Sequence, residues 1–176
     1  MAAELTVQAI GLDRVQGLTK RLRHELDEAE RLGITKSAIA VEQRAKERLS
    51  RTSGGQEDFL WVRSGALRAS VAHTAAERDS QGWLSRVGFR RGRVDKYAPT
   101  QEFGATISAR GGGYLRFPIR EGGGLAKSGI TGWRSVKSVT VPARRPLGRS
   151  LQERRELIAQ YIAAEVQAAV GRAALP

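Results

Sequence analysis

The chain has 176 residues, 40% of them hydrophobic, which is long enough for one domain with a core and too short to favour a second. It contains no cysteine, which excludes a disulfide framework, a cysteine-based zinc site and a thiol nucleophile. Residues 1–85 carry 13 basic and 12 acidic residues, whereas residues 86–176 carry 17 and 6, so nearly all of the net charge of +12 lies in the second half. This excess indicates either a polyanionic or acidic neighbour of the second half or a solvated face.

Residues 12–50 are predicted to be helical, in two segments that break at Gly33. Apolar residues recur at three- and four-residue spacing within 12–26 and again within 34–49, as they do on one face of a helix. The remaining positions carry charges of both signs, which is typical of a solvated helix surface.

An apolar patch at 59–62 follows a run of turn-forming residues. It is either a loop folded over the core or an adhesive surface for a neighbouring subunit. The alternating segments 70–75 and 83–89, with Gln81-Gly82 between them, predict a β-hairpin.

Two further strands are predicted at 114–119 and 135–142. The glycine-rich connections 104–113 and 121–132 are expected to be mobile when the protein is alone. A final helix is predicted at 147–170, with a proline before it and Gly171 after it.

The order of these elements predicts a single α+β domain over residues 1–176. Amino-terminal helices would pack on a small, mostly antiparallel β-sheet formed within residues 64–142, and a carboxy-terminal helix would complete the fold.

Two short segments have direct physical interpretations. Ser64 is predicted to cap a turn in which Gly65 is left-handed, which brings Leu67 and Val71 into the core. Within residues 97–104, Tyr97 and Phe103 are predicted to pack.

Glu102 is a lone carboxylate in a basic part of the chain, and no second carboxylate or histidine lies near it in sequence. We therefore expect a structural ion pair rather than catalysis. Its candidate partners are Arg90, Arg91, Arg93 and Arg144.

Pro142 and Pro146 are expected to fix the backbone where the last strand gives way to the last helix. Arg144, Arg145 and Arg149 then surround the start of that helix. The helix dipole disfavours cations at this end, so an acidic partner is the expected reason for them.

Four stretches, in this order, resemble the neck and tail-completion proteins of long-tailed bacteriophages: Arg63–Val71 (RSGALRASV), Tyr97–Gly104 (YAPTQEFG), Tyr114–Pro118 (YLRFP) and Val139–Leu147 (VTVPARRPL). In that family a long helical segment precedes a TGxLRxSI-like turn, a YAxxxEFG stretch and a VPARPFL-like stretch that leads into the last helix. The resemblance spans essentially the whole chain.

The chain also departs from the family pattern. Ser64 stands where the family has threonine, and the proline stretch carries an extra arginine in Arg144-Arg145-Pro146. Gly148 follows Leu147 where the family has a bulky aromatic residue, and the 121–132 loop is long. These differences concern loop contacts rather than the fold.

The resemblance implies a structural virion protein of the neck that joins tail to head through ring assembly, with a hexamer favoured. Its partners would be the head-tail connector and the tail tube or tail terminator proteins, in the virion and, during assembly, in the host cytoplasm. The basic half would face DNA in the channel or acidic neighbours. The residues expected on that face are Arg90, Arg91, Arg93, Arg110, Arg116, Arg134, Lys137, Arg144, Arg145 and Arg149. The residues expected to shape the fold are Ser64, Gly65, Leu67, Tyr97, Glu102, Phe103, Gly104, Pro142 and Pro146.

The alternative function is a free-standing nucleic-acid-binding protein, favoured by the basic half and by aromatic residues among its arginines. Such aromatics more often belong to a core; they are Trp83, Phe89, Tyr114 and Trp133.

An enzyme is not expected. His24 and His73 lack metal-ligand spacing, and Ser64 lacks the partners of a hydrolase triad. The glycine runs lack the lysine and hydroxyl positions of a phosphate-binding loop. We therefore predict no catalytic residue, metal or cofactor. The chain start does not have the layout of a signal peptide, and no apolar run is long enough to span a bilayer, so no membrane association is expected.

Overall fold

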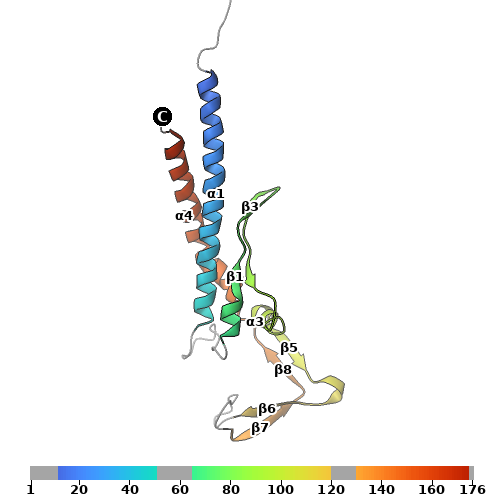
Figure 1. Ribbon diagram of the computed structural model, residues 1–176. Coiled ribbons are helices and arrows are strands. Elements are labelled where there is room, and N and C mark those ends of the chain that lie inside the picture. The colour runs from blue at the N-terminus through green and yellow to red at the C-terminus, as the bar shows by residue number, and fades with distance from the viewer. Residues whose placement is uncertain (1–11, 51–64, 120–129, 175–176) are drawn as a thin grey trace, which may run out of the picture.

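The structure is a computed structural model that describes residues 12–50, 65–119 and 130–174 (Figure 1). It has the predicted α+β arrangement, in which a long amino-terminal helix, small antiparallel sheets and a carboxy-terminal helix follow one another. The helices are α1 (Leu12–Arg48), α2 (Ala66–Ser70), α3 (Ala98–Phe103) and α4 (Pro146–Ala174), with a 3-10 turn, η1, at Arg110–Gly112. The strands are β1 (Val71–His73), β2 (Glu77–Asp79), β3 (Gly82–Leu84), β4 (Val87–Phe89), β5 (Ala105–Ser108), β6 (Leu115–Ile119), β7 (Gly132–Val136) and β8 (Ser138–Val141).

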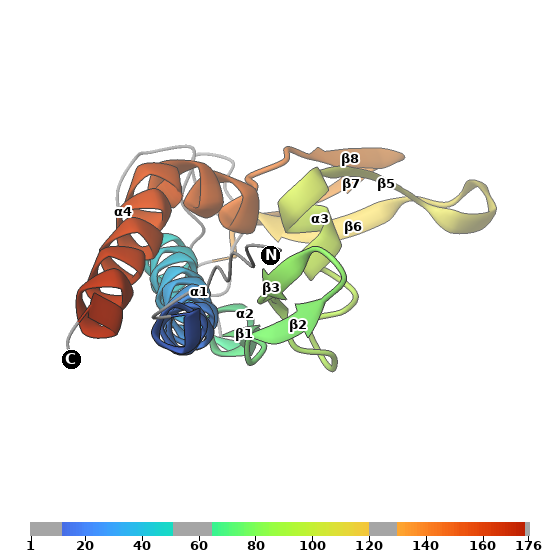
Figure 2. The ribbon, with the colours of Figure 1, turned by 90° about the horizontal axis from the view of Figure 1, so that it is seen from above.

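Helices α1 and α4 lie side by side and run antiparallel (Figures 1 and 2). Four described ion pairs join them, in opposite order along the two helices: Glu25 with Arg172, Lys36 with Glu165, and both Arg44 and Arg48 with Glu153. At 37 residues, α1 is about 55 Å long. None of the described helices is long and apolar enough to cross a membrane.

The predicted break at Gly33 is wrong, because α1 continues through this residue as one helix. A Cβ added to Gly33 would lie 3.1 Å from the Cα of Ile162 and 3.2 Å from its Cγ1. The glycine therefore lets α1 approach α4 closely, and the packing between the helices outweighs the weak helix propensity of glycine.

Replacing Gly33 with alanine is expected to lower the free energy of unfolding by about 1 kcal/mol, because the new methyl group would meet the backbone of α4. Gly17 provides a matched control in the same helix, since nothing lies within 4 Å of the Cβ position there. Gly17→Ala should stabilise the protein by up to about 1 kcal/mol, the gain in helix propensity. Urea unfolding of both variants measures the difference, and stabilisation by both would refute the close-approach explanation.

A small core forms where α1 meets the first β-hairpin. Ala45 and Leu49 of α1 are buried with Val71, and four half-buried side chains pack against them: Leu67, Val87, Phe89 and Leu147. The predicted places of Leu67 and Val71 in the core are confirmed. Gly65 has φ +70° and is left-handed, as predicted. Ser64 and the 59–62 patch lie outside the described residues.

The predicted β-hairpin is confirmed, with its turn one residue earlier. Strand β1 pairs with β4, and β2 pairs with β3, both antiparallel. Asp79 lies opposite Gly82, so Ser80-Gln81 forms the turn. The carboxylate of Asp27 on α1 holds the outer part of the hairpin, because it accepts a hydrogen bond from Trp83 Nε1 at 3.1 Å and pairs with Arg78.

The single sheet that the sequence predicts is instead four antiparallel two-stranded ribbons: β1–β4, β2–β3, β5–β8 and β6–β7. Irregular segments and the short helix α3 separate the ribbons along the chain, so no described strand pairs with more than one neighbour. Figure 2 shows that all four lie on one side of the helix pair.

Three predicted boundaries are also wrong. Residues 104–113 contain β5 and η1, because glycine occurs only at the two ends of this segment and the residues between them pair with β8. The strand predicted at 135–142 bends at Lys137 and is divided between β7 and β8. Helix α4 continues through Gly171, because Ala173 is buried and Arg172 pairs with Glu25. Most of 121–132 lies outside the described residues.

Glu42 of α1 fastens the inner part of the hairpin. Its carboxylate accepts the His73 backbone N–H at 3.1 Å and also pairs with the side chains of His73 and Lys46. Burial raises the pKa of Glu42, but the hydrogen bonds and positive charges of Lys46 and His73 outweigh this effect, so the pKa lies below its ordinary value.

A carboxyl group with a lowered pKa stabilises the fold above its ordinary pKa, about 4.3, and this stabilisation is lost as the pH falls through the lowered value. We therefore expect the free energy of unfolding of the wild type to fall more steeply below about pH 4.3 than that of Glu42→Gln. Chemical unfolding at a series of pH values measures both slopes. Parallel curves would show that Glu42 does not contribute to acid unfolding.

Candidate interaction surface

Two of the ribbons form an arm that extends beyond the end of the helix pair (Figure 1). We define the arm as residues 104–119 and 130–141, which comprise β5–β8, η1 and β6–β7. In the first ribbon Ala105 lies opposite Val141 and Ser108 opposite Ser138. In the second, Leu115 lies opposite Val136 and Ile119 opposite Gly132. The second ribbon thus pairs segments that are closer in sequence than those of the first, and the first ribbon closes the longer loop.

The first ribbon has one face made of hydroxyl side chains. Alternation along β5 and β8, together with their register, places Thr106 opposite Thr140 and Ser108 opposite Ser138 on the same face. All four side chains are exposed, and the hydroxyls of Thr106 and Thr140 lie 3.3 Å apart. We call these four residues the hydroxyl face.

The opposite face of the same ribbon is apolar. It carries Ala105, Val139 and Val141, which are half-buried, and Ile107, which is 47% exposed. The ribbon is therefore amphipathic, with an apolar face that its own chain covers only in part.

The second ribbon exposes large side chains. Trp133 is 55% exposed and Tyr114, just before β6, is 65% exposed. The guanidinium of Arg116 lies 5.2 Å from the centre of the Trp133 ring, within the range of a cation–π contact. The expectation that Tyr114 and Trp133 belong to the core is wrong, whereas Trp83 and Phe89 are half-buried in the hairpin.

The arm is strongly positive. Four exposed cations belong to it, Arg110, Arg116, Arg134 and Lys137, and its described residues include no aspartate or glutamate. Among the described residues, ion pairs connect α1, α4 and the hairpin, and none includes a residue of the arm. The carboxylates of the helices that form described ion pairs thus pair with cations outside the arm and do not neutralise its positive charge.

The remaining predicted basic residues lie in two other places. Arg90, Arg91 and Arg93 are exposed in the segment between β4 and α3. Arg144, Arg145 and Arg149 surround the start of α4, as predicted. The predicted basic residues are therefore divided among three parts of the structure: the arm, the segment between β4 and α3, and the start of α4.

The arm joins the helices where two of the family-like stretches meet. The backbone N–H groups of Arg144 and Arg145 donate to the carbonyl of Gln101 at 2.9 and 3.2 Å. Gly104 has φ +73°, and a Cβ there would lie 2.9 Å from the backbone nitrogen of Ala143, so only glycine fits. Residues 97–104 and 139–147 thus form one joint.

Glu102 is the centre of this joint, and the predicted ion pair with an arginine is wrong. The carboxylate is 9% exposed, and it accepts the backbone N–H groups of Leu147 and Gly148, each at 2.9 Å. Among the described residues no arginine forms a salt bridge with it. The N–H groups at a helix start lack partners within the helix and carry the positive end of its dipole, so they compete well for a carboxylate.

The same contact explains Gly148, since a Cβ there would lie 3.1 Å from Glu102 Oε1. Pro146, the first residue of α4, is buried and occupies a position where its missing N–H costs nothing. Pro142 follows β8 directly and is exposed, so it ends the strand as predicted.

The packing predicted for Phe103 is wrong, because this side chain is 79% exposed. Ala98 and Glu102, four residues apart, share the buried face of α3. Phe103 is the next residue, about 100° further around the helix, and faces outward. Tyr97 is 36% exposed, so its packing is partial.

An apolar cavity of about 370 Å³ lies between α1, α4 and the hairpin, lined by Val41, Trp83, Leu151 and neighbouring residues. No group of three or more histidine, aspartate or glutamate side chains that could hold a metal ion occurs among the described residues.

The hydroxyl face is a feature that the sequence alone did not predict. The alternation in ATIS and SVTV is the signal for it, but the four hydroxyls form one face only in the observed register of β5 with β8. A scan against models of known protein families matches none, and neither the curated proteins nor the solved structures contain a match. The geometry and the four sequence stretches therefore carry the functional argument.

Proposed function

We propose that the chain is a structural subunit of a phage neck, which completes the tail and joins it to the head through ring assembly and protein-protein interfaces. The observation that carries the proposal is the projecting arm, whose large apolar side chains are exposed to solvent. Exposed tryptophan and tyrosine side chains are enriched in protein interfaces and unfavourable on an isolated subunit.

The joint at Glu102 supports the same proposal. Two of the four stretches that resemble tail-completion proteins contact each other there and fix the arm to α4. These residues therefore have a physical role in presenting the arm.

An arm on one side of a subunit suits a head-to-tail ring. Its contact on the next subunit is a different surface, so successive contacts close a ring when the rotation between subunits allows it. We favour a hexamer, with the head-tail connector and the tail tube or tail terminator proteins as axial partners. The function needs no catalytic residue, metal or cofactor and no membrane, and it places the protein in the virion and, before assembly, in the host cytoplasm.

The test is the assembly state of the full chain, measured by light scattering and negative-stain electron microscopy. We expect rings for the wild type and monomers for the double variant Tyr114→Ser with Trp133→Ser. Val170→Ser is the matched control, because Val170 is 49% exposed on α4, away from the arm, and this variant should still assemble. A wild type that remains monomeric at high concentration and binds no head or tail protein would overturn the proposal.

The second candidate is a free-standing nucleic-acid-binding protein, favoured by the basic arm without described acidic residues. The two candidates differ in where the protein is found. A neck protein is a stoichiometric part of purified particles, whereas a free-standing protein is absent from them.

A further inference from the structure

We propose that the arm binds the sugar-phosphate backbone of duplex DNA, without base specificity, through the hydroxyl face of β5–β8 and the cations beside it. This inference deepens the proposed function, since it selects DNA over acidic proteins as the partner of the basic half, and it rests on that function for the presence of duplex DNA.

The hydroxyl face has the chemistry of a phosphate contact. Serine and threonine hydroxyls donate hydrogen bonds to phosphate oxygens, and such contacts position a protein on DNA without reading its sequence. Thr106, Ser108, Ser138 and Thr140 provide four exposed donors. Along each strand of the ribbon, successive hydroxyl side chains on this face are about 7 Å apart. This distance corresponds to about two nucleotide steps of one DNA strand, each of which rises about 3.4 Å along the helix axis.

The cations of the arm provide the attraction. Arg110 and the backbone of Lys137 lie at the far end of the β5–β8 ribbon, where the Ala109 N–H donates to the Lys137 carbonyl at 2.9 Å. Arg116 and Arg134 lie on opposite faces of the β6–β7 ribbon, because Arg116 pairs with Ser135 and Arg134 with Phe117, so these two cations are not part of the site. Because no described carboxylate of the arm competes for Arg110 and Lys137, a polyanion would release condensed counterions when it binds here.

Two features favour duplex DNA over an acidic protein and over single strands. The hydroxyl face has no large apolar side chain, whereas protein interfaces usually bury an apolar centre. It also has no aromatic side chain on which unpaired bases would stack, since Trp133 and Tyr114 belong to the second ribbon and the residues before it.

The primary test is fluorescence anisotropy of a labelled duplex of arbitrary sequence, titrated with the full chain between about 50 and 300 mM salt. We expect binding whose log K falls with log salt at a slope of about −2, from Arg110 and Lys137 at about 0.9 each. Arg110→Gln with Lys137→Gln should weaken binding at least about tenfold and reduce the slope by about 2.

The matched control is Lys20→Gln with Arg155→Gln, which removes two exposed positive charges from α1 and α4. It should change the affinity less than about twofold. An equal loss in both double variants would overturn the inference, because net charge alone would then explain binding.

The hydroxyls are tested by Thr106→Val with Thr140→Val, which keeps side-chain shape and strand propensity. We expect a several-fold loss of affinity with an unchanged salt slope and an unchanged thermal midpoint. Unchanged affinity would remove the hydroxyl face from the site.

Competition separates the partners. Unlabelled duplex should displace the probe more effectively than single-stranded DNA or poly-glutamate at equal charge concentration. Stronger competition by either of these would overturn the choice of duplex DNA. Electron microscopy of the same variants separates this inference from the proposed function. Rings that bind no DNA would contradict only the DNA site. DNA binding by a protein that remains monomeric would contradict only the role in the neck.

Discussion

Glu102→Ala is expected to lower the free energy of unfolding by about 3 kcal/mol, since each hydrogen bond to a charged group contributes roughly 1.5–3 kcal/mol. The substitution leaves the backbone N–H groups of Leu147 and Gly148 without their acceptor at the start of α4. It also removes a negative charge from the positive end of the helix dipole, where three arginines already crowd the same turn.

Urea unfolding of two further variants tests the cause. Glu102→Gln retains one acceptor oxygen, so we expect about half of the loss. Glu156→Ala removes an exposed carboxylate from the same helix and should change stability by less than about 0.5 kcal/mol. Equal stability of Glu102→Ala and Glu156→Ala would contradict the role of the joint.

The loss should also reach the arm. Because the contact of Glu102 with α4 holds the segment that leads into β5, its removal frees the arm to change its angle to the helices. Hydrogen exchange is therefore expected to rise in residues 105–108 and 138–141 of Glu102→Ala before it rises in α1.

The elements were predictable where a short pattern decides them. The helical periodicity of α1 and α4, the hairpin and the left-handed Gly65 all follow from residues close together in sequence. Gly33 was misjudged because its role depends on Ile162, which only the packed helices bring next to it. Local propensity indicates a break at glycine, and tertiary packing reverses that indication.

The candidate surface was predictable in charge but not in geometry. The excess of basic residues in the second half is visible in the sequence. The hydroxyl face needs the pairing of residues 105–108 with 138–141, and a one-residue slip would turn every hydroxyl to the apolar side. Glu102 was expected to be structural, but its partner is the backbone of a helix 45 residues later, and the sequence has no marker for such a bond.

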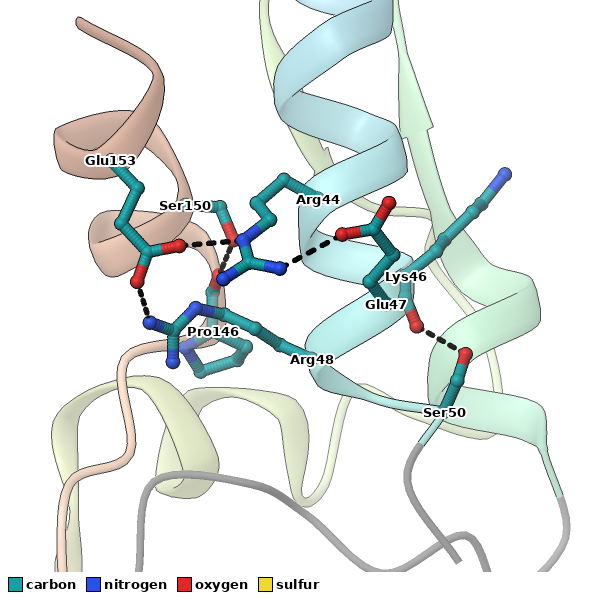
Figure 3. Close-up of polar contacts among 8 residues, drawn as sticks. All are labelled: Arg44, Lys46, Glu47, Arg48, Ser50, Pro146, Ser150 and Glu153. Carbon is teal, nitrogen blue, oxygen red and sulfur yellow. Dashed lines mark hydrogen bonds and ion pairs between the residues drawn. The ribbon is translucent and has the colours of Figure 1, made fainter. Parts of the chain in front are cut away.

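Glu153→Gln is expected to lower the free energy of unfolding by about 2 kcal/mol. The carboxylate lies between two arginines of α1 (Figure 3): its Oε2 accepts Arg44 Nε at 2.6 Å and its Oε1 pairs with Arg48. The side chain of Arg48 is only 6% exposed, so the loss of this carboxylate removes a counter-charge from a guanidinium that is largely shielded from water. Glu153 itself is 37% exposed, and water screens part of the interaction, which places the expected loss below that of a fully buried pair.

The pKa of Glu153 also indicates that its ion pairs stabilise the fold. Burial raises it, but hydrogen bonds and charges from Arg44 and Arg48 outweigh burial, so the pKa lies below its ordinary value. The ion pairs therefore stabilise the fold above about pH 4.3 and lose their effect as the pH falls through the lowered pKa.

Glu47→Gln is the matched control, because Glu47 also pairs with Arg44, at 2.9 Å, but is 55% exposed and does not contact Arg48 in any described interaction. It should cost less than about 0.5 kcal/mol. A double-mutant cycle then isolates the buried contact: in an Arg48→Met background, Glu153→Gln should cost clearly less than in the wild type, because only the more exposed contact with Arg44 is then left to lose. If Glu153→Gln costs as much in that background as in the wild type, the buried ion pair is not what holds α4 against α1 at this end of the helix pair.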